Sequence, residues 1–157
     1  MATTRVLGID PGKRQTWYAL ILFTSHQNYD LYHTEVVDTG HIDLYPDDPL
    51  NERMPLVREA VEHIYLKTKP DLVCAERYIV RPGKGQGNVS EIVNLFLGLV
   101  YSEMFGREVP CDLLMPSQHK TWSKANMLRD PGWRWGLNAH ESDAATLAIY
   151  GAVKRSL

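Results

Sequence analysis

The order of the apolar segments is the feature that most restricts how this chain can fold. Three runs rich in β-forming residues, 4–10, 16–23 and 31–42, follow one another with short polar connections, which predicts an antiparallel meander. Further along, helical and strand-like runs alternate, with helices at 54–67, 89–106, 116–128 and 138–155 and strands at 72–80 and 109–115. Such alternation favours parallel strands joined by crossover helices. The sequence therefore predicts an α/β protein with a five-stranded mixed sheet, antiparallel in strands 1-2-3 and parallel in strands 4 and 5, flanked by helices.

The bulk composition is that of an ordinary soluble globular protein. The chain has 157 residues, of which 44% are hydrophobic and 23% are charged, and this predicts one domain over 1–157. No apolar run reaches the roughly 18 residues that cross a bilayer, and the first residues lack the apolar stretch of a signal peptide. We therefore expect a cytoplasmic protein without membrane contact.

The cysteines and the net charge narrow the functional classes. Cys74 and Cys111 both lie in strand-like apolar runs, where unpaired buried thiols are more common than a disulfide or a metal site. The formal net charge of −2 is unfavourable for a nucleic-acid-binding protein, although the distribution of charge matters more than its sum.

Acidic side chains stand at the ends of two predicted strands and at the start of the last predicted helix. Asp10 closes the first strand, and Glu76 follows the apolar run 72–75. Asp143 lies in the first turns of the last helix, and His140, three residues earlier, shares its helix face. Open α/β sheets place their chemistry at the ends of strands. These four side chains are therefore candidate active-site residues.

Each acid also has a structural interpretation. Asp10 precedes a Pro-Gly turn and could serve that turn, and Glu76 could pair with its neighbour Arg77. Asp143 could complement the dipole of its helix. Three converging carboxylates, however, repel one another unless a cation lies between them. Carboxylate oxygens with one imidazole suit Mg²⁺ or Mn²⁺, whereas a structural zinc site would use more cysteine and histidine.

Glu141 fits a structural role better than a metal-binding one. Asn138 is a good N-cap residue, and Glu141 stands three residues later, as in a capping box. The remaining histidines share no ligand spacing and are predicted to be surface or half-buried residues; they are His26, His33, His41, His63 and His119.

Basic and aromatic residues accompany the acidic ones. The segment 81–88, RPGKGQGN, is glycine-rich and cationic, but it has neither the P-loop order nor the Rossmann glycine pattern, so we expect no nucleotide cofactor. Cations and aromatic rings around carboxylates suit a phosphodiester backbone near unpaired bases. The alternative is that most of these charges are simply solvated. The predicted DNA-contacting residues are Lys13, Arg14, Arg77, Tyr78, Arg81, Lys84, Lys120 and Lys124.

Three motifs in a fixed order give the chain a family resemblance. GIDPG at 8–12, AER at 75–77 and HESDAA at 140–145 resemble motifs of the RuvC family of Holliday junction resolvases, which have the ribonuclease H-like fold. GIDPG alone is a weak signal, because sugar kinases and actin-like ATPases open similarly. The resemblance covers almost the whole chain and implies a single RuvC-like nuclease domain.

The resemblance implies a role for each candidate residue. Lys120 matches a lysine near the scissile phosphate, where it would help neutralise developing charge. The implied reaction is hydrolysis of a phosphodiester with two Mg²⁺ ions, for which Mn²⁺ can substitute. The implied partner is branched DNA, above all a four-way junction, nicked symmetrically by a homodimer. The metal-binding positions of the family fall on Asp10, Glu76, His140 and Asp143.

The chain departs from the family pattern in two places. Between Lys120 and His140 it is shorter than the bacterial enzymes and carries DPGWRWGLN in place of a lysine-bearing helix, which suggests a phage or other viral member. The position three after the glutamate, often aromatic and used to wedge into the junction, is Ile79, and whether Tyr78 replaces it stays open. The long apolar helix 89–105 is the expected dimer face as well as part of the core.

Other functional classes stay open on the sequence. A ribonuclease H-like nuclease that cuts flap DNA or RNA–DNA hybrids would share all four metal-binding positions. A non-catalytic DNA-binding protein could keep the fold, although the intact acidic set argues against it. An actin-like or sugar-kinase-type ATPase is a weaker alternative, because the chain is too short for two lobes.

Overall fold

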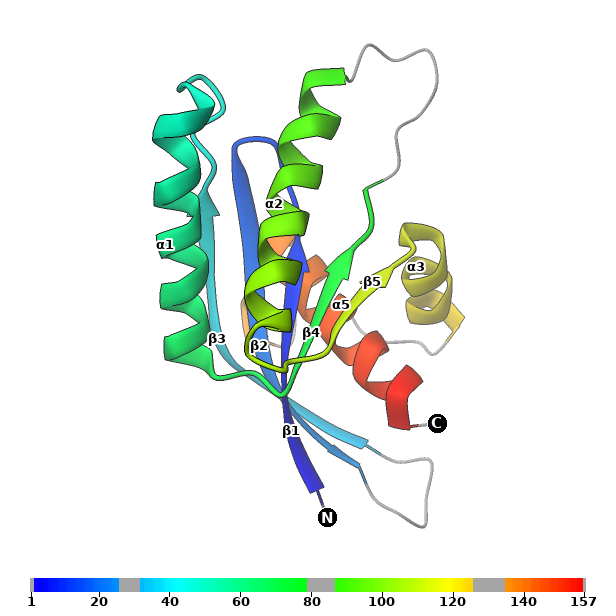
Figure 1. The fold of residues 1–157 in the computed structure, drawn as a ribbon. Helices are drawn as coiled ribbons and strands as arrows, with labels where there is room; N and C mark the ends of the chain where they lie inside the picture. The colour runs from blue at the N-terminus through cyan, green and yellow to red at the C-terminus, as the bar shows by residue number, and fades with distance from the viewer. Residues whose placement is uncertain (1, 26–31, 79–86, 126–134, 157) are drawn as a thin grey trace.

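The computed structural model describes residues 2–25, 32–78, 87–125 and 135–156. Within these ranges the strands are β1 (Ala2–Asp10), β2 (Gln15–Ser25), β3 (Tyr32–Asp43), β4 (Leu72–Glu76) and β5 (Cys111–Leu114). They form one mixed sheet in the order β3-β2-β1-β4-β5 (Figure 1). β2 pairs antiparallel with β1 and β3, whereas β4 runs parallel to β1 and β5. The predicted five-stranded mixed sheet is confirmed.

β1 is the central strand and is buried on both faces. Every residue from Val6 to Ile9 is buried, because helices cover both sides of the sheet. A strand in this position is apolar at nearly every residue. β1 departs from that pattern at its last residue, Asp10, which stands at the C-terminal end of the strand.

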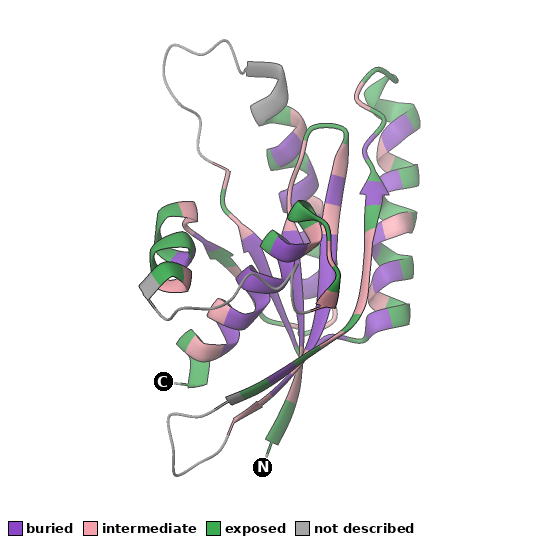
Figure 2. Cartoon of the chain, turned by 180° about the vertical axis from the view of Figure 1, so that it is seen from behind, coloured by how far each residue is buried: buried purple, intermediate pink, exposed green. Residues whose placement is uncertain are grey.

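Helices cover the two faces of the sheet. α1 (Leu50–Thr68) and α2 (Gly87–Phe105) lie on one face, and α5 (Ala139–Ser156) crosses the other with α3 (Pro116–Ala125) beside it (Figures 1 and 2). The α1–α2 face packs large side chains such as Phe96 and Met104, and the α5 face packs Leu147 and Ile149 among alanines. No helix in the described part of the chain has the length and apolar character to span a membrane.

Among the described residues, two predicted boundaries differ from the structure by more than two residues. α1 begins at Leu50, four residues before the predicted start, and Pro49 occupies its N-cap. The N–H groups of a first helical turn have no partner within the helix, so a proline at the helix start costs little. β4 ends at Glu76 and does not continue through 77–78, whereas the rest of the predicted strand lies outside the described residues. The shorter strand places Glu76 at the strand end.

Both cysteines are free thiols, as predicted. Cys74 is buried in the sheet and Cys111 is half-buried. Burial raises the pKa of both thiols, that of Cys111 to about 11. They are therefore protonated and unreactive at neutral pH.

α5 approaches the sheet closely because two glycines remove side chains from its path. A Cβ on Gly8 of β1 would overlap the carbonyl oxygen of Ala144, and a Cβ on Gly151 of α5 would overlap Sγ of Cys74. Any larger residue at either position would push the helix away from the sheet. The contact at Gly8 holds the first half of α5 against β1, two residues before Asp10.

We expect Gly8→Ala to destabilise the fold at least as much as ordinary overpacking, which costs about 1–3 kcal/mol. The obstacle is a backbone carbonyl of α5, so the helix must shift as a unit. Urea denaturation measures the change in the free energy of unfolding. Gly106→Ala is the matched control, because a Cβ there would meet its nearest atom at 3.6 Å, an ordinary contact. A Gly8→Ala variant as stable as Gly106→Ala would contradict this account of the packing.

Candidate active site

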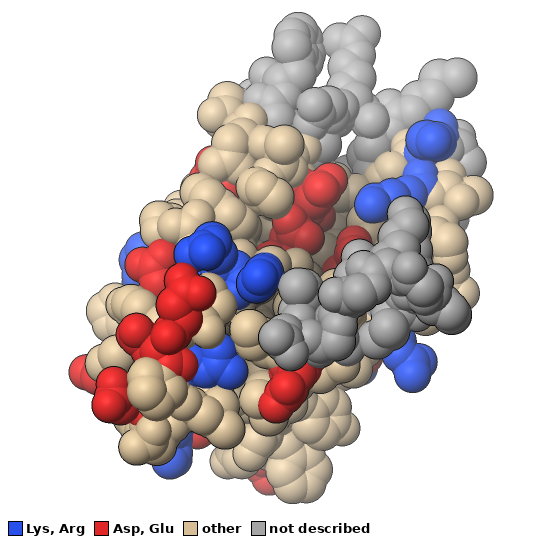
Figure 3. Space-filling model, turned by 90° about the horizontal axis from the view of Figure 1, so that it is seen from above, with Lys and Arg blue, Asp and Glu red and all other residues tan. Residues whose placement is uncertain are grey.

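Asp10 and Glu76 lie on neighbouring strands at one edge of the sheet. β1 and β4 are parallel, with Ile9 in register with Ala75, so the two acids occupy the next position of each strand. This confirms the predicted pairing of the first and fourth strands. Figure 3 looks onto this end of the molecule and shows Asp and Glu side chains near the centre of the face, with Lys and Arg side chains on either side.

His140 reaches Asp10 from the first turn of α5. Its Nδ1 lies 3.1 Å from Oδ2 of Asp10. Because an ionised carboxylate only accepts hydrogen bonds, the ring N–H is the donor. The Asp10 side chain is 15% exposed and that of His140 is 63% exposed, which places the contact at the rim of the site.

The surroundings of Asp10 penalise its ionised form. Burial raises the pKa of Asp10, the hydrogen bond from His140 opposes that rise, and the charges of Asp143 and Glu76 add to it, so that the pKa lies above its ordinary value. The negative charges of the three carboxylates therefore repel one another. A cation bound among them would relieve this repulsion.

The start of α5 is held by a capping box. The N–H of Glu141 donates to Oδ1 of Asn138 at 2.8 Å, and the N–H of Asn138 donates to Oε1 of Glu141 at 3.2 Å. The predicted structural role of Glu141 is confirmed. These paired bonds fix the helical turn that carries His140 and leads to the exposed Asp143.

A buried histidine supports Glu76. Nε2 of His119, on α3, lies 2.8 Å from Oε2 of Glu76, and the His119 side chain is 1% exposed. The prediction that His119 is a surface or half-buried residue is wrong, because α3 turns this ring inward toward the end of β4. In the sequence, only the position of His119 beside Lys120 pointed to a place near the site, because its spacing from the other histidines does not match that of metal ligands.

Trp17 is a neighbour of the site that the sequence analysis did not single out. It stands opposite Asp10 in the pairing of β1 and β2. Its ring stacks on that of His140, with centroids 5.8 Å apart and 9° between the planes. On β3, His41 packs against the Trp17 ring at 4.8 Å. Trp17 thus packs against the face of the His140 ring. The pairing register of the first two strands, which sets Trp17 opposite Asp10, was the signal that could have identified it.

The predicted DNA-contacting residues differ in their surroundings. Arg14 forms an exposed ion pair with Asp47 at 3.2 Å. Tyr78 is half-buried and packs against the core on the α1–α2 face. The exposed members are Lys13, Arg77, Lys120 and Lys124. Arg81 and Lys84 lie outside the described residues, and so does Ile79, the junction-wedge position.

The donor types at this edge suit a hard divalent cation. Carboxylate oxygens and one imidazole are ligands that Mg²⁺ and Mn²⁺ accept, and the repulsion that helps to raise the pKa of Asp10 favours a positive charge here. Among the described residues, no three His, Cys, Asp or Glu side chains are gathered closely enough to hold a metal ion. His140 instead donates to Asp10. The residues therefore fit such an ion in type and charge, and binding would have to draw the side chains together.

Comparison with known proteins identifies the family. The family model described as crossover junction endodeoxyribonuclease RuvC matches residues 6–120, a range that includes Asp10 and Glu76 but not α5. The crossover junction endodeoxyribonuclease RuvC of Neisseria meningitidis serogroup C is 30% identical over 97 residues, which are 62% of this chain and 47% of that protein. The match thus spans about half the length of this curated relative.

Two solved structures share the fold. Thermus thermophilus RuvC in complex with a Holliday junction substrate is 21% identical, with a TM-score of 0.75 and coverage of 98% of this chain and 95% of that one. The yeast mitochondrial Holliday junction resolvase Ydc2 is 16% identical, with a TM-score of 0.62 and coverage of 98% and 85%. These likenesses confirm the predicted ribonuclease H-like fold. Because the family model matches well over half of its residues, this chain belongs to the RuvC family.

Proposed function

We propose that this protein is a structure-selective endonuclease that resolves four-way DNA junctions by metal-dependent hydrolysis of phosphodiester bonds. The observation that carries the proposal is the placement of Asp10 and Glu76 at the adjacent ends of parallel strands in a chain of the RuvC family. RuvC-like nucleases are metal-dependent. The proposed unit is a single nuclease domain over 1–157.

The proposed metal is Mg²⁺, two ions per site, with Mn²⁺ as a substitute. When bound, the ions would activate a water molecule and stabilise the leaving oxygen. His140 donates its Nδ1–H to Asp10, which would leave Nε2 available as a metal ligand, and Trp17 stacks on its ring at the rim of the site. The residues that would hold the metal are Asp10, Glu76, His140 and Asp143.

Basic residues around the acids would bind the DNA backbone. Lys120 is exposed on α3, one residue after the buried His119, and would help neutralise charge that develops on the phosphate. Tyr78, half-buried against the core, would reach DNA only through its exposed part. The further proposed contacts are Lys13, Arg14, Arg77, Arg81, Lys84 and Lys124.

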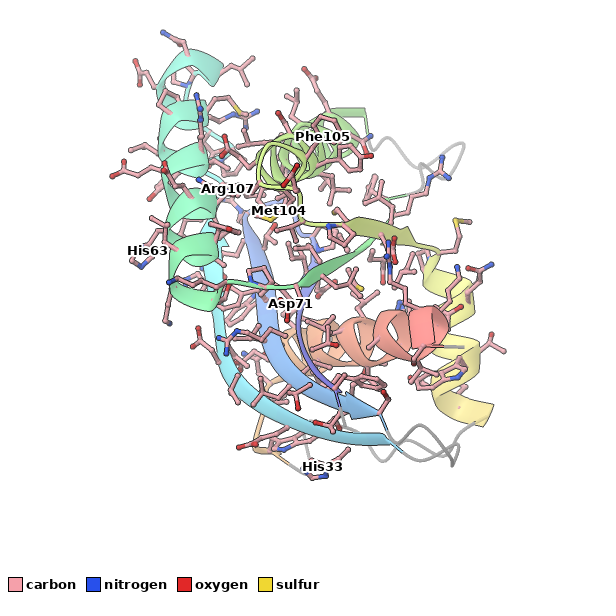
Figure 4. The ribbon with its side chains drawn as sticks, turned by 60° about the horizontal axis from the view of Figure 1, so that its bottom comes forward. His33, His63, Asp71, Met104, Phe105 and Arg107 are labelled. Carbon is pink, nitrogen blue, oxygen red and sulfur yellow. The ribbon has the colours of Figure 1, made fainter. Side chains whose placement is uncertain are left out.

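The outer face of α2 is the proposed dimer interface. Leu95, Tyr101 and Phe105 of this helix are 37%, 50% and 75% exposed, and large apolar side chains grouped on a surface can mark an interaction site. Figure 4 shows Met104 between α2 and the sheet and Phe105 on the outer side of the helix. A two-fold dimer would present two sites to a substrate with two-fold symmetry.

A cleavage assay on a synthetic four-way junction tests the proposal. We expect paired, symmetric nicks in Mg²⁺ and none in EDTA. A flap substrate and an RNA–DNA hybrid are assayed in parallel, and preferential cutting of either would favour a broader ribonuclease H-like nuclease. Binding without cutting, over a range of salt and metal concentrations, would identify a non-catalytic DNA-binding protein and overturn the proposed activity.

A further inference from the structure

We infer that His119 is a positioning residue for Glu76: its buried ring fixes the orientation of that carboxylate and thereby sets the affinity of the site for its divalent metal. The inference rests on the proposed function, because it concerns the same site. The carrying observation is a short contact between a fully buried ring and a strand-end acid, 2.8 Å from Nε2 to Oε2.

The contact has the features of a dedicated support. The Glu76 carboxylate accepts, so Nε2 carries the proton and donates. Nδ1 of the same ring is buried and has no hydrogen-bond partner among the described residues. Leaving a buried polar atom unpaired costs stability, and an apolar side chain of similar volume would avoid that cost. Packing alone therefore does not account for a histidine at this position.

The hydrogen bond limits the rotation of Glu76. A glutamate at a strand end can turn about several bonds, and anchoring Oε2 restricts where Oε1 can lie. Carboxylates that bind metals are commonly held by such hydrogen bonds from behind, and losing one typically costs about 10–100-fold in metal affinity. His119 is placed to supply this restraint, since Glu76 keeps 22% of its side chain exposed while the ring behind it is covered.

The same contact ties α3 to the end of β4. The N–H of Arg77 donates to the carbonyl oxygen of Leu114 at 2.8 Å, which joins the ends of β4 and β5, and α3 begins two residues later at Pro116. His119 adds a second link from α3 to Glu76. Lys120 is the next residue after His119. The buried His119 ring therefore connects Glu76, the proposed metal ligand, to the segment that carries the proposed phosphate-contacting lysine.

The test compares two substitutions of His119 in the whole protein. His119→Leu removes the donor, whereas His119→Gln can place an amide N–H near the position of Nε2. Mn²⁺ binding is measured without DNA by isothermal titration calorimetry. We expect Leu to weaken Mn²⁺ binding about tenfold or more and Gln to retain most of the affinity. The matched control is His63→Leu, at an exposed histidine that points away from the body of the protein on α1 (Figure 4), which should bind Mn²⁺ as wild type does.

The outcomes separate a positioning role from a structural one. Wild-type Mn²⁺ affinity in His119→Leu, or equal losses in Leu and Gln, would overturn the inference. If His119→Leu does not fold, His119→Asn replaces it, because the asparagine amide reaches only the position of Nδ1. Mn²⁺ affinity that is retained in His119→Gln and lost in His119→Asn supports the inference. Equal Mn²⁺ affinities in these two variants overturn it. The titration uses no DNA, so a wild-type protein that binds Mn²⁺ but cuts no junction would overturn the proposed function alone.

Discussion

Asp10→Asn is expected to abolish junction cleavage and, at the same time, to stabilise the folded protein at neutral pH. Cleavage should fall by about 10²–10³-fold or more, the scale on which single groups that stabilise a transition state act. Junction binding should persist, because the asparagine side chain would keep the shape of the site and the surrounding cations are untouched. Gel-based cleavage and binding assays in Mg²⁺ measure the two effects separately.

The gain in stability follows from the sign of the pKa shift. The pKa of Asp10 is raised in the folded state, chiefly by burial, with Asp143 and Glu76 adding to the rise. The folded protein therefore binds this proton more tightly than the unfolded chain does, so stability falls as pH rises from the unfolded pKa through the folded one. Above both values the full penalty applies, and asparagine removes it. Below both values the variant should lose its advantage over the wild type.

Urea denaturation at neutral and at acidic pH measures this difference. Asp48→Asn is the matched control, because Asp48 is an exposed acid in the connection before α1 and should change neither cleavage nor stability appreciably. Wild-type rates of cutting in both Asp10→Asn and Glu76→Gln would show that these acids are not the active site. A less stable Asp10→Asn at neutral pH would show that the folded protein does not penalise the ionised Asp10 side chain as inferred.

Phe105→Glu is expected to convert the proposed dimer to monomers. Phe105 is 75% exposed on the outer face of α2, and removing a hot-spot aromatic side chain from an interface typically costs about 2–4 kcal/mol of binding free energy. A glutamate there would also place a charge in the core of the proposed interface, where charged residues are depleted. Sedimentation equilibrium measures the dissociation constant of the dimer, and a cruciform plasmid reports whether the two nicks remain paired.

The matched control for Phe105→Glu is Leu66→Glu. Leu66 is 54% exposed on α1, so the substitution adds the same charge to a different helix and should leave the dimer intact. Monomers that still nick one strand at a time would show that the site itself is unaffected. Tight dimers in Phe105→Glu would place the interface elsewhere.

Much of this architecture follows from local patterns. The alternation of apolar runs predicted the sheet, and the strand-end positions of Asp10 and Glu76 predicted that they would meet, because parallel neighbouring strands end at one edge. Asn138 and Glu141 formed the expected capping box because that motif depends only on residues three apart. Each of these predictions needed only the residues of one short segment or the order of the segments along the chain.

The features that the sequence did not predict depend on tertiary packing. His119 is buried because α3 docks with one particular face toward β4, and nothing in the spacing of the histidines determines that face. Trp17 reaches His140 only because α5 crosses the sheet beside β2. Leu50 begins a helix despite the surrounding prolines, because Pro49 can occupy the N-cap and leave the turn after it free to form.

The order in which the site residues occur along the chain has a consequence for synthesis on the ribosome. Asp10 and Glu76 lie in the first half of the chain and are made before α5, whereas a domain generally folds as one unit. His140 and Asp143 join them only when α5 docks against Gly8. A nascent chain that lacks α5 would thus carry only two of the four proposed metal ligands, and we expect it not to nick DNA.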